Sequence, residues 1–140
     1  ASLATEIADE FAFLDDWEQR YAHVIDLGKS LAPLADHERT EANLVRGCAS
    51  QVWLVSEHGE ADQILFRGQS DSLLVGGLVA LLTRLLSGQP AQAILDFDVA
   101  GFLSEIGVAE ALTSQRANGL ASMVARIRAD AGRVNATERP

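Results

Sequence analysis

The spacing of apolar residues predicts helices at both ends of the chain and a short β region between them. Apolar side chains recur at intervals of three or four in two neighbouring stretches near the start, as expected for the buried faces of two helices. These positions are Ile7, Phe11 and Leu14, then Trp17, Tyr21, Val24 and Ile25. Asp15 or Asp16 can cap the second helix, and Gly28 can end it.

The middle of the chain changes from a helical period to short extended runs. Residues 29–43 contain a proline and a run of charges, which is typical of a polar loop. Three short strands are predicted after it, near 43–46, 52–57 and 63–67, with residues 58–61 turning the second strand into the third.

The second half of the chain returns to a helical pattern. A run of leucines after residue 71 predicts a buried central helix, which Ser87 and Gly88 end. Two short helices follow, one starting at Pro90 and one near Ala100, and a long last helix runs from a cap at 113 or 114 to Gly132. Residues 133–140 are polar enough to form a flexible tail.

Together these elements predict an α+β fold in one domain over residues 1–140. The small antiparallel sheet would have three strands, with the helices packed on one side. A chain of 140 residues that is 48% hydrophobic is large enough for one modest core. The longest uncharged stretch, residues 72–83, is shorter than the roughly 20 apolar residues that cross a bilayer, so we expect no membrane anchor.

Charge and cysteine content narrow the function classes. Eleven basic and twenty acidic side chains leave a net charge of −9, which repels nucleic acid and anionic lipid surfaces. One cysteine cannot form an internal disulfide, and no secretory leader is visible, so we expect a reducing cytoplasm. His23, His37 and His58 lack the spacing of zinc ligands, so we expect no bound metal.

The single cysteine, Cys48, follows a glycine and precedes small and polar residues. Gly47 can adopt backbone angles that other residues avoid, so the chain can turn there and present the sulfur. A buried free cysteine that packs as a small hydrophobic residue is an equally good interpretation of this setting alone.

Residues 47–54, Gly-Cys-Ala-Ser-Gln-Val-Trp-Leu, resemble the Gly-Cys-x-Ser-x-Val-Trp signature of the SufE family of sulfur acceptors. Four further motifs of that family have counterparts in the same order and spacing over residues 11–131. They are Trp-Glu-Gln-Arg-Tyr at 17–21 with Asp-Leu-Gly at 26–28, Gly-Gln-Ser-Asp at 68–71, Asp-Phe-Asp at 96–98 and Arg-Ala-Asn-Gly-Leu at 116–120.

The resemblance implies a sulfur carrier in iron–sulfur cluster assembly, with a fold similar to that of the scaffold protein IscU. Such a protein takes persulfide sulfur from a SufS-like cysteine desulfurase, stimulates that enzyme and passes the sulfur to a SufBCD-like cluster scaffold. Pyridoxal phosphate would belong to the desulfurase, and this chain would need no cofactor and would not turn over alone. The close paralogue CsdE, which serves a different desulfurase, has nearly the same motifs and remains an alternative.

Within this hypothesis Cys48 is the nucleophile that becomes a persulfide. Arg46 can raise its thiolate fraction, although an exposed arginine on a strand is an equally good interpretation. Gly47 can act as a hinge. Three small or polar neighbours complete the loop: Ala49 fits a narrow channel, and Ser50 and Gln51 can hold the loop or orient the sulfur.

Two supporting residues, Asp71 and Arg116, come only from the resemblance. Alternatively, the Asp71 carboxylate can stabilise the positive end of the dipole of the helix that follows it. Arg116 is expected to make an exposed contact with a partner or an ion pair.

A lone thiol must hand whatever it acquires to another molecule, which favours a carrier. A one-cysteine thiol redox protein and a non-catalytic adaptor remain alternatives. We expect the sulfur of a carrier to be sheltered between partners, beside Trp53, Leu54 and neighbouring helices, and the loop to rearrange when a desulfurase binds. The main role expected of Trp53 is that of an ordinary core aromatic.

Overall fold

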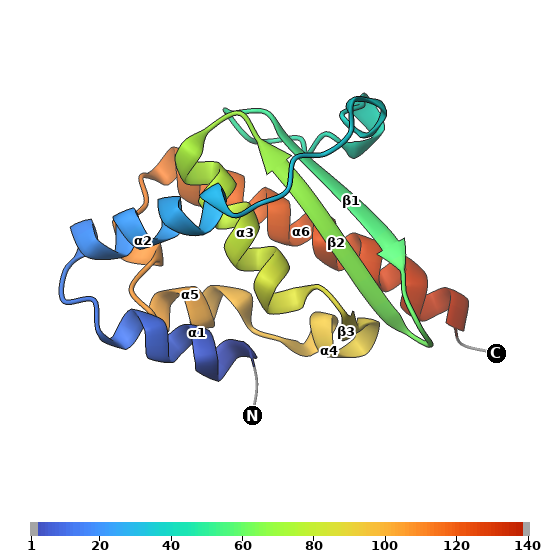
Figure 1. Cartoon of the computed structure of the whole chain (residues 1–140). Coiled ribbons are helices and arrows are strands. Elements are labelled where there is room, and N and C mark those ends of the chain that lie inside the picture. Colours follow the sequence, from blue (N-terminus) through green and yellow to red (C-terminus); the bar gives the residue numbers. More distant parts are fainter. Residues whose placement is uncertain (1–2, 139–140) are drawn as a thin grey trace.

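The computed structural model describes residues 3–138 and has the predicted α+β architecture (Figure 1). The first half contains helices α1 (Leu3–Ala12) and α2 (Trp17–Lys29), single 3₁₀ turns η1 (Asp36–Glu38) and η2 (Glu41–Asn43), and strands β1 (Val52–His58) and β2 (Gln63–Ser70). The second half contains α3 (Leu73–Leu86), β3 (Gln89–Pro90), α4 (Ala91–Asp96), α5 (Val99–Glu105), η3 (Ala109–Ala111) and α6 (Ser114–Glu138).

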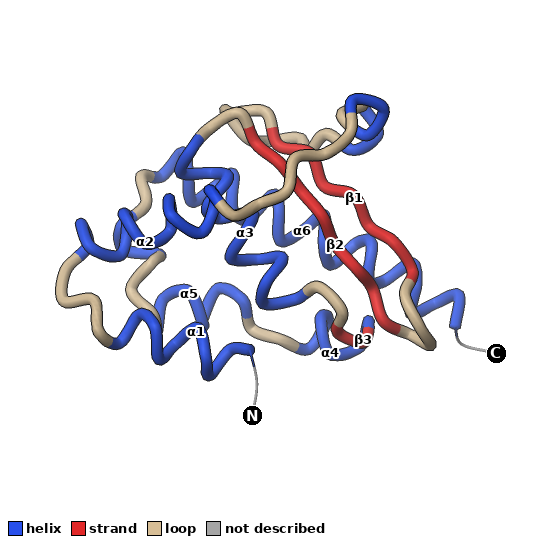
Figure 2. Tube along the Cα trace, in the orientation of Figure 1, coloured by secondary structure: helices blue, strands red, loops and turns tan. Residues whose placement is uncertain are grey.

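The sheet has three antiparallel strands in the order β1-β2-β3, and the helices lie on one side of it (Figure 2). Strands β1 and β2 form the predicted hairpin, in register from Val52 opposite Ser70 to His58 opposite Ile64. Side chains of β2 alternate between buried and exposed, so one face of the sheet packs on the helices.

The predicted strand at 43–46 is wrong. Glu41–Asn43 closes into a 3₁₀ turn, and only an isolated bridge from Leu44 to Trp53 remains of the pairing. The third strand is instead Gln89–Pro90, which pairs with the start of β2. Pro90 also precedes α4, and an edge strand tolerates a proline because its missing N–H is not needed for pairing.

Helix α3 is the centre of the core, as its leucine pattern predicts. Eleven of its residues are buried, and it packs against both α2 and β2. Gly77 lets α2 approach closely, because a Cβ there would lie 2.0 Å from the carbonyl oxygen of Val24. Gly28 lies in the same contact, where a Cβ would lie 2.6 Å from the nitrogen of Gly77.

Helix starts lie close to the predicted positions, although α4 begins at Ala91 and not at Pro90, and two helix terminations differ from the prediction. Asp16 caps α2 by accepting a 2.9 Å hydrogen bond from the Gln19 N–H. Gly28 does not end α2, which continues to Lys29, because this glycine serves helix packing.

Likewise, Gly132 does not end α6, which runs to Glu138. Two buried residues just before it, Asp130 and Ala131, keep this part of α6 packed on the protein, and a helix interior tolerates a glycine at a cost of about 1 kcal/mol. The predicted tail at 133–140 is therefore helical as far as 138, and residues 139–140 lie outside the described part. Within residues 3–138, no helix combines the length and apolar content that crossing a bilayer requires.

Candidate functional site

Cys48 lies in the loop of residues 46–51, here called the Cys48 loop, which connects the isolated bridge at Leu44 to β1. Gly47 adopts a φ of +93°, in the left-handed region that favours glycine, so the turn depends on this residue. A Cβ at Gly47 would also lie 2.5 Å from Ser122 Oγ, which shows how closely the loop approaches α6. The predicted sharp turn is therefore confirmed.

The Cys48 sulfur is half-buried and faces a cavity of about 160 Å³ between the loop, α3 and α6. The thiol donates a hydrogen bond to the carbonyl oxygen of Gly119, at 3.4 Å from Sγ. Burial raises the pKa of Cys48 above its usual value, because the thiolate loses hydration. The cavity is lined by Cys48, Ala49, Ser50, Val75, Leu78, Gln115, Arg116, Gly119, Leu120 and Met123.

Helix faces shelter the sulfur, whereas the expected contribution of Trp53 and Leu54 is wrong. In β1 the side chains of Val52 and Leu54 are buried under the helices, and Trp53 points to the opposite face of the sheet. Neither Trp53 nor Leu54 lines the cavity around Cys48. Successive side chains of a strand point to opposite faces of the sheet, so the sequence alone already places Trp53 on the other face from Val52 and Leu54.

Asp71 holds the end of the Cys48 loop against the start of α3. Its carboxylate accepts a 3.0 Å hydrogen bond from the Gln51 N–H, and its own N–H donates to the Gln51 carbonyl oxygen at 3.2 Å. Ser72 is the cap of α3, so Asp71 lies before the helix. The helix-dipole alternative is therefore replaced by a direct contact with a loop residue.

Arg116 lies in the first turn of α6 and lines the cavity that the Cys48 sulfur faces. It is half-buried, so the expected exposure is met only in part. Its Nη1 donates to the Tyr21 hydroxyl oxygen at 2.9 Å, and Tyr21 in turn makes an edge-to-face contact with Trp17 at 6.2 Å between ring centroids. Tyr21 belongs to the motif at 17–21, but nothing in the sequence pairs it with Arg116.

Arg46 is exposed at the edge of the loop, and it does not line the cavity. The pKa of Cys48 is raised by burial, which is opposite to the shift expected from a neighbouring cation. Ala49 is exposed and Ser50 half-buried, and both line the cavity. Of the sequence-predicted residues around Cys48, the structure thus places Ala49, Ser50 and Arg116 in the cavity wall, whereas Gly47, Gln51 and Asp71 shape and hold the loop.

Gly119 is a site residue that sequence reasoning did not single out. A Cβ at this position would lie 3.5 Å from the Cys48 sulfur, within the space that the thiol faces. The bare backbone of α6 therefore supplies both the accepting carbonyl and room beside the sulfur. Its place in the motif at 116–120 was the only available signal.

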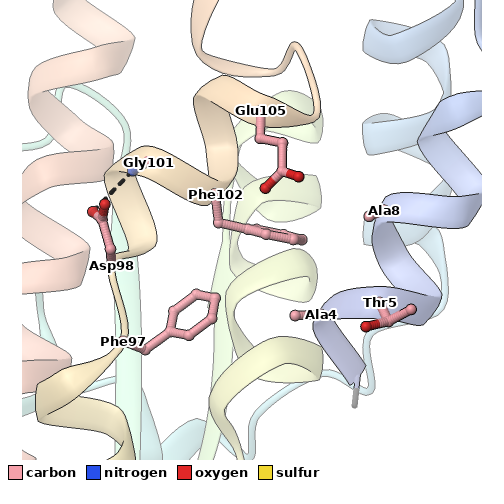
Figure 3. Close-up of a pocket in the computed structure, with 8 residues that line it drawn as sticks. All are labelled: Ala4, Thr5, Ala8, Phe97, Asp98, Gly101, Phe102 and Glu105. Atoms are coloured by element: carbon pink, nitrogen blue, oxygen red, sulfur yellow. Dashed lines mark hydrogen bonds between the residues drawn. The ribbon is translucent and has the colours of Figure 1, made fainter. Parts of the chain in front are cut away.

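A larger cavity, of about 480 Å³, lies between α1 and α5 (Figure 3). Phe97 and Phe102 project into it, with the carboxylates of Asp98 and Glu105 at its edge. Asp98 is already engaged as the cap of α5, where it accepts a 3.0 Å hydrogen bond from the Gly101 N–H. Among the described residues, no thiol, histidine or lysine lines this cavity, so the candidate chemistry lies at Cys48.

The described part of the chain contains no cluster of side chains that could bind a metal ion. Among the side chains that the structure describes, no three of His, Cys, Asp or Glu lie close enough together to hold an ion. His23 instead contacts the Glu10 carboxylate, at 3.1 Å between Nε2 and Oε1, and Glu10 also forms an ion pair with Arg84. The absence of a metal in the working protein stays a prediction.

Comparison with known proteins shows the family of the chain. The SufE family model, described as an Fe-S metabolism associated domain, matches residues 5–131. An uncharacterized SufE-like protein of Rhizobium etli is 52% identical over 130 residues, which cover 90% of this chain and 87% of that protein. Another from Rhizobium meliloti is 49% identical over 129 residues, covering 90% and 92%.

A solved structure supports the fold. The solution structure of a hypothetical protein from Thermus thermophilus superposes with a TM-score of 0.78 and covers 96% of both chains. The two sequences are 19% identical, so this likeness concerns the fold alone.

Proposed function

Because this chain belongs to the SufE family, which is associated with Fe–S metabolism, we propose that it accepts sulfur on Cys48 from a cysteine desulfurase. The carried sulfur then passes to an iron–sulfur cluster scaffold. In this role the chain activates the desulfurase as its co-substrate and has no turnover of its own. Pyridoxal phosphate stays on the desulfurase, and the exchange takes place in the reducing cytoplasm, where a lone thiol persists.

The proposed transfer is a thiol exchange in which atoms and electrons balance. The Cys48 thiolate attacks the outer sulfur of a cysteine persulfide on the desulfurase, and a new S–S bond forms. The S–S bond of the donor breaks, and its electron pair returns to the desulfurase cysteine as a thiolate. Cys48 then holds the persulfide, and no external oxidant or reductant is consumed.

The observation that carries this proposal is the position of the sole thiol of the chain beside a small cavity. A cavity of about 160 Å³ has room for one added sulfur atom, since a water molecule occupies about 30 Å³ in the liquid. Apolar side chains of α3 and α6 form much of its wall, which would keep small cellular thiols from the persulfide.

Two neighbours fit supporting roles in this transfer. Arg116 lines the cavity, and its guanidinium can attract an anionic persulfide as it forms. Asp71 holds Gln51 in the sheltered conformation, so breaking that contact would free the loop to enter the active site of a partner. A raised thiol pKa in the free protein fits the same scheme, because the thiol would react only after the loop leaves its shelter.

The thiol redox alternative fits this geometry less well. Cysteines that react with peroxide are exposed and have lowered pKa values, whereas Cys48 is half-buried and its pKa is raised. A sulfur carrier needs a cavity that shelters the sulfur between partners and a loop that can expose it to a partner.

Intact-mass spectrometry after incubation with a desulfurase and free cysteine tests the proposal. We expect wild-type protein to gain one sulfur atom at Cys48 and the desulfurase to turn over faster. Cys48→Ser should gain no sulfur and give no stimulation. Stimulation that survives Cys48→Ser would identify an adaptor, and peroxide consumption without a desulfurase would identify a redox protein.

The choice of desulfurase is tested in the same assay. A SufS-like enzyme and the paralogous enzyme served by CsdE would each be titrated against the wild-type chain. A lower half-saturating concentration for the SufS-like enzyme supports the proposal, and preference for the paralogous enzyme would assign the chain to the CsdE type.

A further inference from the structure

Two large aromatic side chains are exposed where α1 leads into α2. Phe13 is 84% exposed and Trp17 is 57% exposed, although both rings would lose an unfavourable contact with water on burial. Phe13 stands on the connection between the helices, and Trp17 is the first residue of α2. These two residues are here called the aromatic patch. Exposed aromatic groups of this kind are typical of the anchor residues in protein interfaces.

The aromatic patch is connected to the Cys48 cavity by a chain of direct contacts. Trp17 packs edge-to-face on Tyr21, and the Tyr21 hydroxyl accepts a hydrogen bond from Arg116, which lines the cavity. Figure 1 shows the first turns of α2 and α6 at the same end of the molecule. A partner that reaches Cys48 past Arg116 would therefore also meet this end of α2.

The charged residues next to the aromatic patch in the sequence are acidic. Asp15, Asp16 and Glu18 are exposed beside it, and the chain as a whole carries a net charge of −9. No lysine or arginine occurs between residues 1 and 19. A complementary surface would present an apolar depression for the rings and a rim of lysine or arginine side chains, which would also accelerate association.

We propose that Phe13 and Trp17 dock on the cysteine desulfurase, in an apolar depression rimmed by basic side chains. This inference rests on the proposed function. A standard interface buries about 800 Å² on each partner, which is far more than the rim of the Cys48 cavity offers. The donor of sulfur must cover Cys48, so its interface extends over neighbouring surface, and the aromatic patch joins that surface through Tyr21 and Arg116.

Sulfur loading as a function of concentration tests the docking role. The double variant Phe13→Ser with Trp17→Ala would be compared with wild type, using persulfide formation on Cys48 as the readout. We expect the half-saturating concentration to rise roughly tenfold or more, with the rate at saturation unchanged, because anchor residues contribute to binding and not to the chemical step. Circular dichroism melts should be unchanged, since both side chains are exposed.

Leu65→Ser is the matched control. Leu65 is also an exposed apolar residue, at 41%, but it lies on β2 and belongs neither to the Cys48 cavity nor to the contact chain that leads to it. The half-saturating concentration for sulfur loading of Leu65→Ser should stay within about twofold of the wild-type value, as for a surface change outside an interface. A charge variant, Glu18→Lys, should slow association several-fold at low salt and much less at high salt.

Four outcomes would overturn the inference. The first is an unchanged half-saturating concentration in the double variant. The second is normal loading with slower delivery to the scaffold, which would assign the aromatic patch to the scaffold. The third is a wild-type dimer that the double variant converts to monomer without an effect on loading. The fourth is a wild-type chain that gains no sulfur at all, which would refute the proposed function itself and the partner named here with it.

Discussion

The Cys48 loop and the β1–β2 hairpin are consecutive in the chain and are held in very different ways. The hairpin is paired at every position from Val52 to His58, and alternate side chains are buried under the helices. The loop depends on a few separate contacts, chiefly those of Cys48 with Gly119 and of Gln51 with Asp71. A segment with so few contacts can open at low cost while the paired strands stay closed.

The same difference appears in two glycines. Gly77 lies in the core, where α2 leaves no room for a side chain. Gly47 allows a left-handed turn that aims the thiol at a cavity. The first glycine supports a rigid frame, and the second supports a loop that the proposed function requires to move.

The largest effect is expected from breaking the frame. Gly77→Val should lower the free energy of unfolding by about 3 kcal/mol or more, because the new Cβ would meet the backbone of Val24 at 2.0 Å. Gly76→Ala is the control, since no atom of another element lies within 4 Å of a Cβ there, and it should be neutral or slightly stabilising. Chemical denaturation measures both, and equal stabilities would show that α2 and α3 are not held as closely as we describe.

The second-largest effect is a loss of sulfur acceptance without a loss of stability. Cys48→Ala should abolish persulfide formation while lowering the free energy of unfolding by no more than about 1 kcal/mol, because the thiol is half-buried and borders an existing cavity. Mass spectrometry and thermal melts of the same preparation separate the two effects. A loss of several kcal/mol would instead support the interpretation of Cys48 as a structural core residue.

Loosening the loop should expose the sulfur. Asp71→Ala removes the acceptor for the Gln51 N–H, so we expect alkylation of Cys48 by iodoacetamide to accelerate roughly fivefold to tenfold, as for the loss of about 1 kcal/mol of contact. Asp26→Asn is the control, because Asp26 is exposed and pairs with Lys29 on the surface of α2. Equal alkylation rates in wild type and Asp71→Ala would mean that this contact does not keep the loop closed.

The smallest effect concerns pH. Burial holds the pKa of Cys48 above its usual value, so the fraction of thiolate, and with it the alkylation rate, should rise at higher pH than in an unstructured cysteine peptide. Asp71→Ala should move this profile back toward lower pH as the thiol becomes hydrated. A wild-type profile at or below that of the peptide would indicate that a cation, such as Arg46, acts on the thiol in solution.

Local pattern was enough to predict much of this protein. The apolar spacing predicted α2, α3 and α6, and the alternation around residues 52–67 predicted the hairpin, because helix and strand periods are properties of short segments. The motif around Cys48 pointed to the thiol and to its family without any knowledge of the fold. These features rest on neighbouring residues, which the sequence displays directly.

Tertiary structure alone decided the rest, because it depends on residues that are far apart in the chain. Gln89 and Pro90 form a strand only because β2 lies beside them, and Gly28 packs against Gly77 where its sequence context suggested a helix end. Asp71 meets Gln51 across 20 positions, and Arg116 meets Tyr21 across 95. The helix and strand periods of short segments do not encode such pairs. The cavity around Cys48 could therefore be found only in the tertiary structure.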